Sequence, residues 1–266
     1  KQKNYPGRAW AQDFLVDDFN VDGLPDVAVV GMSGFNILFQ SPVGVFKRAT
    51  GPVIHYPFFG FASGDFNSDG LADVVVSQNV PDAKDWHVQQ GGYYVNIYTA
   101  LGGGKFERTG HTLVGKYPLA IVCEDFDHDG LSDLAVSTEA NGGTLTLLYG
   151  QLGGGVGGMT DFPSGVTGEM IAADLDLDGW SDIAIVDTVG GTLSVLCGLP
   201  GRTFAAPQTY TLLLPRALCA GDFNGDGRPD IVVAGGKWGK QGLVTVLYGQ
   251  EGGGFGQATE YPVGKT

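Results

Sequence analysis

The sequence predicts an all-β protein built from five similar units of about four strands each. An acidic nine-residue motif occurs five times, and each copy is followed by a run rich in Val, Ile and Ala. Such runs favour strands, and the 45 glycines gather between them, where hairpin turns need positive φ. The motif starts lie 47, 60, 49 and 48 residues apart, a period typical of a solenoid or a propeller.

The acidic motif carries an Asp or Asn at positions 1, 3, 5 and 9 and a Gly at position 6. Its copies read DFNVDGLPD from Asp18, DFNSDGLAD from Asp65, DFDHDGLSD from Asp125, DLDLDGWSD from Asp174 and DFNGDGRPD from Asp222. Side chains at alternate positions of a tight loop point to one side. We therefore expect positions 1, 3 and 5 to converge on one cation, with the position-7 carbonyl as a further donor. The glycine fits a sharp turn through positive φ.

The donor set favours Ca²⁺, which takes six to eight oxygen ligands, over Mg²⁺ with its strict octahedral geometry or Zn²⁺ with its nitrogen and sulfur ligands. An empty loop would gather three or four carboxylates, and like charges ~4 Å apart repel by about 1 kcal/mol in water and ~4 kcal/mol near a protein surface. A metal-free Asx-rich turn is the alternative for a single copy. Five copies favour about five bound Ca²⁺ ions.

The ligand set differs from that of an EF-hand, whose loop ends with a bidentate Glu at position 12. Position 12 is a residue that cannot ligate in all five copies, namely Val29, Val76, Val136, Ile185 and Val233. Each lies in a strand-like run, where an EF-hand would begin a helix. We expect the set to close at position 9.

The net charge of −14 belongs mainly to these motifs, which hold 17 of the 29 acidic residues. Five divalent ions would reduce it to −4. The basic patch of a nucleic-acid-binding protein is missing, and no run of about 18 apolar residues suggests a transmembrane segment.

The third unit shows the expected order of strands, at 118–124, 133–138 and 144–149, with a fourth ending at 162–163. An aromatic residue followed by Pro recurs where one unit passes to the next, as at Tyr117-Pro118. We predict units at about 6–56, 57–117, 118–165, 166–213 and 214–262 of a single domain, 1–266. Either the five units close into a ring, or they belong to a larger array.

The five motifs resemble the FG-GAP or VCBS repeats of integrin α-subunit head domains, bacterial surface proteins and fungal lectins. The resemblance covers nearly the whole chain. It implies a β-propeller of four-stranded blades with calcium between the first and second strands of each blade. That family usually has seven blades, and only Phe255-Gly256 keeps its Phe-Gly pair.

Carried over to this chain, the resemblance implies calcium ligands at positions 1, 3, 5 and 9 and at the position-7 carbonyl. These are Asp18, Asn20, Asp22, Leu24 and Asp26; Asp65, Asn67, Asp69, Leu71 and Asp73; Asp125, Asp127, Asp129, Leu131 and Asp133; Asp174, Asp176, Asp178, Trp180 and Asp182; and Asp222, Asn224, Asp226, Arg228 and Asp230.

A second candidate site is the longer connection of the second unit. Residues 81–92 include Trp86 and His87 and lead into Tyr93, and Trp238 stands in a smaller counterpart in the fifth unit. Aromatic rings beside amide and charged groups often hold a sugar. The alternative is a surface loop whose Trp folds back on its own blade.

The leading functional hypothesis is a secreted or cell-surface, calcium-stabilised module that recognises a glycan or an extracellular protein without catalysis. A propeller domain of a polysaccharide-active enzyme is one alternative. The inner-strand segments AIVC, MIAA and ALCA are small and apolar, however, with Arg8, Asp13, Glu169 and Arg216 as the only nearby charges. A self-assembly module is the other. Calcium sites of extracellular modules bind at ~10⁻⁴ to 10⁻³ M, so we expect an extracellular, cell-surface or periplasmic location.

The three cysteines, Cys123, Cys197 and Cys219, fall in three different units without metal-binding spacing. We expect them to be buried small hydrophobic residues. A bridge between Cys123 and Cys219 is the alternative.

Overall fold

A computed structural model of the chain describes residues 11–31, 34–52, 58–80, 92–139, 142–236 and 242–264. These residues form five four-stranded antiparallel sheets and one two-stranded hairpin. The predicted all-β propeller of five four-stranded blades is therefore confirmed. We number the blades 1 to 5 in chain order.

In every blade the strands follow one another in chain order from the inner to the outer edge. Blade 1 contains β1 (Ala11–Asp17), β2 (Asp26–Gly31), β3 (Gly34–Gln40) and β4 (Phe46–Thr50), and blade 2 contains β5 (Phe58–Gly64), β6 (Asp73–Val80), β7 (Gly92–Ala100) and β8 (Phe106–Val114). Blade 3 contains β9 (Pro118–Glu124), β10 (Asp133–Thr138), β11 (Thr144–Gly150) and β12 (Val156–Pro163). Blade 4 contains β13 (Met170–Ala173), β14 (Asp182–Asp187), β15 (Thr192–Leu196) and β18 (Gln208–Thr211), and blade 5 contains β19 (Pro215–Gly221), β20 (Asp230–Gly236), β21 (Gly242–Leu247) and β22 (Thr259–Val263).

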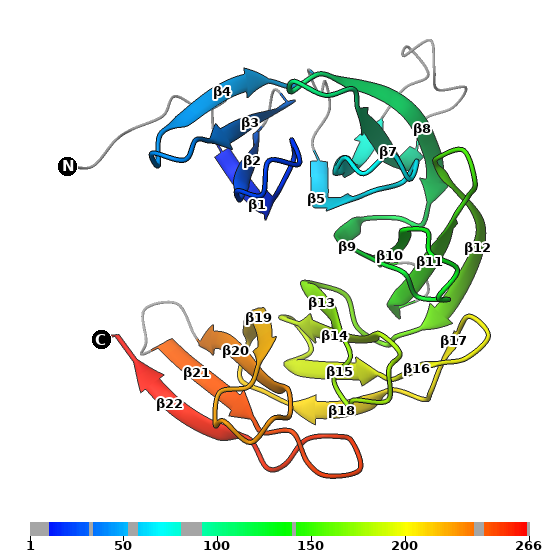
Figure 1. Cartoon of the computed structure of the whole chain (residues 1–266). Helices are drawn as coiled ribbons and strands as arrows, with labels where there is room; N and C mark the ends of the chain where they lie inside the picture. The colour runs from blue at the N-terminus through cyan, green and yellow to red at the C-terminus, as the bar shows by residue number, and fades with distance from the viewer. Residues whose placement is uncertain are drawn as a thin grey trace.

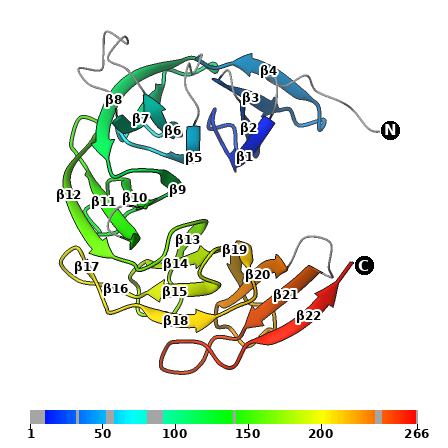
Figure 2. The ribbon, with the colours of Figure 1, turned by 180° about the vertical axis from the view of Figure 1, so that it is seen from behind.

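The blades are arranged around an arc, with the first strand of each nearest the centre (Figure 1). The reverse view shows the same order (Figure 2). In both views blade 1 and blade 5 lie apart, so the arc is open between them. The five sheets do not close into a ring.

The acidic motif is the turn between the first and second strands of every blade. Its position-9 Asp is the first residue of the second strand and pairs with the last residue of the first, as Asp17 does with Asp26. The position-6 glycines have φ between 81° and 93°, as expected. Position 4 is also left-handed in all five loops, at Val21, Ser68, His128, Leu177 and Gly225. The sequence pattern did not reveal this, because four of the five are not glycine.

The hydrophobic core consists mainly of four clusters, one at each junction between neighbouring blades, and a small fifth cluster of Val80 and Tyr94 lies within blade 2. Alternate residues of a strand face opposite sides, so each middle blade contributes one face to the junction before it and one to the junction after it. In β10, Leu134 and Val136 pack toward blade 2, whereas Ala135 packs toward blade 4. Burial of both faces explains why these strands are continuous apolar runs.

Hydroxyl groups add polar links across three junctions. Ser77 Oγ donates to the Pro118 carbonyl at 2.9 Å, Ser137 Oγ to the Gly168 carbonyl at 3.0 Å, and Thr188 Oγ1 to the Pro215 carbonyl at 2.7 Å. Each link joins the second strand of a blade, or the turn after it, to the entry of the next blade.

In blade 4 the connection between the third and fourth strands forms a separate short hairpin, β16 (Gly198–Leu199) with β17 (Thr203–Phe204). Its pair Gly198–Phe204 is equivalent to Gly150–Val156 in blade 3 and to Gly249–Phe255 in blade 5. Phe204 returns from this hairpin to pack edge-on against Phe162 at a centroid distance of 5.2 Å.

The cysteines differ from expectation. All three are free, with Cys123 and Cys197 half-buried and Cys219 exposed. The prediction of burial was wrong for Cys219, because its side of β19 faces no neighbouring blade.

Candidate metal loops and an aromatic surface

The position-1 carboxylate organises the backbone of each loop. Asp65 Oδ1 accepts a hydrogen bond from the Asp69 amide at 3.2 Å, and Oδ2 accepts one from the Gly70 amide at 2.8 Å. The other four loops repeat this pair of bonds. Amide donors favour the ionised form. For Asp18, burial is the largest single influence and raises the pKa. The amide donors together outweigh it, so the pKa of Asp18 is lowered.

The side-chain oxygens at positions 3 and 5 also accept hydrogen bonds from backbone amides of their own loop. The position-3 oxygen accepts the position-5 amide in all five loops. The position-5 carboxylate then accepts the position-7 amide, as Asp69 does from Leu71 at 2.8 Å. Each carboxylate oxygen has a second lone pair, so the loops hold oriented oxygens that can still bind a cation.

Position 9 has an additional role that the spacing did not reveal. Asp182 is fully buried; its Oδ2 accepts the Leu175 amide at 2.8 Å and its Oδ1 accepts the Gly198 amide at 2.7 Å. Asp73, Asp133 and Asp230 make the same two bonds, to loop position 2 and to the end of the third strand. The position-9 carboxylate thus fastens each loop to its blade.

The surroundings of these buried carboxylates disfavour their ionised form. Burial, followed by the charges of neighbouring loop carboxylates, raises the pKa of Asp73, Asp133 and Asp182 to about 6 despite their amide donors. The pKa of Asp26 is raised for the same reasons. A bound divalent cation would relieve the repulsion and favour the ionised form.

Two loops bring ligand atoms from three acidic residues within 4.8 Å of one another. In the third loop they belong to Asp125, Asp127 and Asp133, and in the fourth to Asp174, Asp176 and Asp178. Positions predicted to share a cation are thus adjacent in these two loops. The position-7 carbonyls stay a prediction, as does the complete ligand set.

Two observations test whether a cation fits. Asp26 Oδ2 is buried and has no hydrogen-bond partner among the described residues. In the third loop, the Arg202 guanidinium pairs with two of the loop carboxylates: its Nε lies 2.5 Å from Asp127 Oδ2, and its Nη2 lies 3.6 Å from Asp129 Oδ2. Both observations fit a loop that binds positive charge.

Arg202 comes from the turn between β16 and β17 of blade 4, and its guanidinium also lies 4.3 Å from the centroid of the Tyr149 ring. Next to it, His128 of the third loop stacks on Trp180 of the fourth at 4.1 Å and 5°. These contacts join the two loops at the surface.

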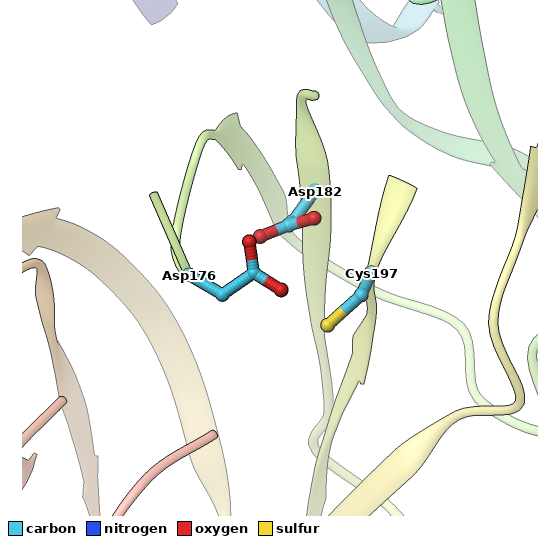
Figure 3. Close-up of side chains that lie close together, drawn as sticks. All are labelled: Asp176, Asp182 and Cys197. Carbon is cyan, nitrogen blue, oxygen red and sulfur yellow. The ribbon is translucent and has the colours of Figure 1, made fainter. Parts of the chain in front are cut away.

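Cys197 was not among the predicted site residues. Its Sγ lies within 4.8 Å of carboxylate oxygens of Asp176 and Asp182 (Figure 3). Burial and these two charges raise the pKa of the thiol to about 12. Cys197 comes directly before Gly198, whose amide binds Asp182. The equivalent residues in the third and fifth repeats are Tyr149 and Tyr248, so no regular pattern indicated a thiol here.

Three aromatic rings form a cluster on blades 2 and 3, which we call the aromatic cluster: Phe59, Tyr93 and Tyr117. Tyr93 lies 5.1 Å from Tyr117 and 6.2 Å from Phe59 between centroids. Tyr117 is 43% exposed, and a side-chain hydrogen bond between the two hydroxyls is the main cause that raises the pKa of Tyr93. Of the predicted sugar-binding residues, Tyr93 is in this cluster; Trp86, His87 and Trp238 lie outside the described residues.

Two acidic residues lie near the centre of the arc. Asp13 and Glu169 both line a small cavity of about 40 Å³ with Phe59, Ala120 and Met170. Burial, followed by the charge of Asp13, raises the pKa of Glu169. The cavity is about the volume of one water molecule and its surroundings, so it does not accommodate a sugar ring.

Comparison with protein families finds a repeat in two parts of the chain. The model of the FG-GAP-like repeat matches residues 18–76 and 174–233, and each of these segments runs from one acidic motif to the strand that follows the next. FG-GAP-like repeats are therefore present in two places of this chain. Comparison with curated proteins found no match.

Among solved structures, this chain is similar to a lectin of Agrocybe aegerita that specifically recognises non-reducing terminal N-acetylglucosamine. The identity is 17% and the TM-score 0.52; the match covers 94% of this chain and 66% of the lectin. The V. cholerae biofilm matrix protein Bap1 matches with 18% identity and a TM-score of 0.43 over 94% of this chain and 39% of Bap1. This chain therefore spans about two thirds of the lectin's length. At this identity, the similarity to the lectin shows the fold alone.

None of the described residues belongs to a helix that is apolar and long enough to cross a membrane.

Proposed function

We propose that this propeller is a calcium-stabilised, non-catalytic recognition module that binds a glycan outside the cell. The observation that carries the glycan assignment is the aromatic cluster, in which Tyr117 is exposed while Tyr93 and Phe59 are partly exposed. Binding sites combine aromatic surface with a few placed polar groups. Tyrosine supplies both, because its ring is apolar and its hydroxyl forms hydrogen bonds.

Charged groups beside the cluster support the assignment. Lys116 and Glu139 are exposed, and the Glu139 amide donates to the Lys116 carbonyl at 2.9 Å, which holds the two chain segments together. The charge of Glu139 contributes to raising the pKa of Tyr93. A sugar ring could cover the aromatic faces while its hydroxyls reach these groups. A lectin with the same fold makes N-acetylglucosamine a suitable first probe.

The role proposed for calcium is structural. When bound, the ion neutralises the loop carboxylates and fixes the turn between first and second strands. Extracellular calcium modules work at ~10⁻⁴ to 10⁻³ M, which supports a location outside the cytoplasm.

A matched pair of tyrosine variants tests the glycan site. We expect the calcium-loaded protein to bind terminal N-acetylglucosamine or another glycan of an array, and Tyr117→Ala to weaken that binding by about tenfold, a loss of roughly 1.4 kcal/mol. Tyr261→Ala is the control, because Tyr261 is 46% exposed and its hydroxyl also lies near another tyrosine, 3.5 Å from Tyr248. Equal binding by both variants, or no binding by the parent protein, would contradict the proposal.

A further inference from the structure

In every blade, the connection between the third and fourth strands places one left-handed residue at the same point. It stands four residues after the residue whose amide binds the position-9 carboxylate of that blade. In blade 4 this residue is Arg202, with a φ of 64°. In the other blades it is a glycine with a φ between 68° and 96°, namely Gly44, Gly104, Gly154 and Gly253. Residues other than glycine seldom adopt this conformation, so an arginine is unexpected there.

This point of the connection lies against the metal loop of the preceding blade. A β-carbon added to Gly154 would lie 3.2 Å from Cβ of Asn67, and one added to Gly253 would lie 3.2 Å from Cβ of Asp176. Asn67 and Asp176 are the position-3 residues of the second and fourth loops. A side chain at the equivalent point of blade 4 therefore begins beside position 3 of the third loop, which is Asp127.

The Arg202 guanidinium pairs with the second oxygen of two carboxylates in that loop. Oδ1 of Asp127 accepts the Asp129 amide at 3.0 Å, and Oδ1 of Asp129 accepts the Leu131 amide at 2.9 Å. Their Oδ2 atoms lie 2.5 Å from Arg202 Nε and 3.6 Å from its Nη2, respectively. The ring of Tyr149 lies 4.3 Å from the guanidinium carbon and holds the cation beside the loop.

We propose that Arg202 determines the calcium affinity of the third loop, because its guanidinium competes with the ion for the carboxylates of Asp127 and Asp129. This inference rests on the calcium role proposed above and is independent of the glycan site. Two cations that share the same carboxylates repel each other, and the affinity of a calcium loop depends on the charge of its ligands. The third loop therefore binds calcium more weakly than the fourth, which also has four Asp but has Gly253 at the equivalent point.

The competition connects blade 3 to blade 4 in a calcium-dependent way. At low calcium, Arg202 supplies part of the positive charge that the third loop needs and joins the loop to the connection of the next blade. At high calcium, the ion replaces the guanidinium. A guanidinium that stayed on the carboxylates outside a bound ion would instead hold the ligands in place and leave the affinity equal or higher, so the measured affinity separates the two arrangements.

Calorimetric titration of the chain with calcium tests the proposal, with Arg202→Gly as the main variant because the other blades have glycine at this point. We expect one site to bind calcium about tenfold more tightly in the variant than in the parent. Asp125→Ala removes a predicted ligand of the third loop but neither partner of Arg202, so in that background the gain should vanish.

Lys105→Gln is the matched charge control. Lys105 is exposed on the equivalent connection of blade 2 and makes no ion pair with a loop carboxylate among the described residues, so its loss should leave every affinity unchanged. Arg202→Gly with unchanged or weaker calcium binding would overturn the proposal, as would an equal gain in Lys105→Gln. A parent protein that binds no calcium would overturn the calcium role of the loops, and this inference with it.

Melting curves of Arg202→Gln give a second measurement that does not depend on counting sites. In chelator, the variant should melt about 2 °C below the parent, because the third loop loses its ion pairs. In saturating calcium, where the ion has displaced the guanidinium, the variant should melt at or above the temperature of the parent. An equal lowering in both conditions would show that Arg202 stays on the calcium-loaded loop and would overturn the competition.

Discussion

At the scale of single residues, the four Asp or Asn positions of a loop are not equivalent. Position 5 lies at the surface, and Asp178 there accepts one bond from the Trp180 amide at 2.8 Å. Position 9 is buried, and in four of the five loops its carboxylate accepts hydrogen bonds from two backbone amides. The position-5 carboxylate is placed to bind an ion, whereas the position-9 carboxylate supports the fold even without one.

This difference predicts distinct effects of Asp182→Ala and Asp178→Ala in chelator. Removal of Asp182 leaves two buried amides unpaired, each at a cost of ~1–3 kcal/mol; relief of carboxylate repulsion offsets part of this, so we expect a net loss of about 2 kcal/mol, or roughly 5 °C in melting temperature. Asp178→Ala should cost less than about 0.5 kcal/mol. Thermal melts of both variants without calcium measure this, and equal melting temperatures would show that Asp182 has no structural role.

At the scale of the elements, the sequence predicted the turns and strands that a local residue pattern determines. The motif-to-strand transition follows from five acidic turns, each leading into a β-branched run, and the first three strands of blade 3 have the expected bounds at β9 and β10 and end within a residue of them at β11. The hairpin β16–β17 was not predicted, because Gly198-Leu199 and Thr203-Phe204 are too short to give a pattern.

The candidate sites were predictable to different degrees for the same reason. The spacing of Asp125, Asp127 and Asp133 predicted their convergence, because it is a local property of the loop. The approach of Arg202 to Asp127 depends on a hairpin of the next blade, and the meeting of Phe59, Tyr93 and Tyr117 depends on three separate strand ends. Contacts of that kind leave no periodic signal in one sequence.

The loops should also give the protein an unusual response to pH. The pKa of Asp73, Asp133 and Asp182 is about 6 in the folded protein against ~3.9 in an unfolded chain. The folded state therefore binds these protons more tightly, and their contribution to stability, complete below pH ~4, is lost as the pH rises through 6. Without calcium, we expect the melting temperature to rise by several degrees from pH 7 to pH 5.

Calcium should reverse that response, because it binds only the ionised carboxylates. In excess calcium, acidification from pH 7 to pH 5 should lower the melting temperature as protons compete with the ion. Melting curves at both pH values with calcium and with chelator form the complete test. The same direction of change in both conditions would contradict calcium binding at these carboxylates.

At the scale of the whole molecule, the loops and the hydrophobic junctions are mechanically connected. The position-2 residue of each of the first four loops leaves the acidic turn and enters the core between two blades, as Phe66 does between blades 2 and 3. An ion that orders the loop therefore also holds a junction residue in place. The fifth loop differs, because Phe223 enters no junction among the described residues.

This connection predicts that calcium stabilises the entire arc and that the loops contribute unequally. One site contributes ~2.7 kcal/mol when free calcium is 100 times its dissociation constant, so chelator should lower the melting temperature by at least about 10 °C.

In calcium, Asp69→Ala in the second loop should lower the melting temperature by several degrees, because that loop orders Phe66. Asp226→Ala in the fifth loop removes an equivalent carboxylate and should lose markedly less, because Phe223 packs against no neighbouring blade. Scanning calorimetry of the parent and the two variants measures both effects; if chelator left the melting temperature of the parent unchanged, or if both variants lowered it equally in calcium, calcium binding would not be connected to the packing of the junctions.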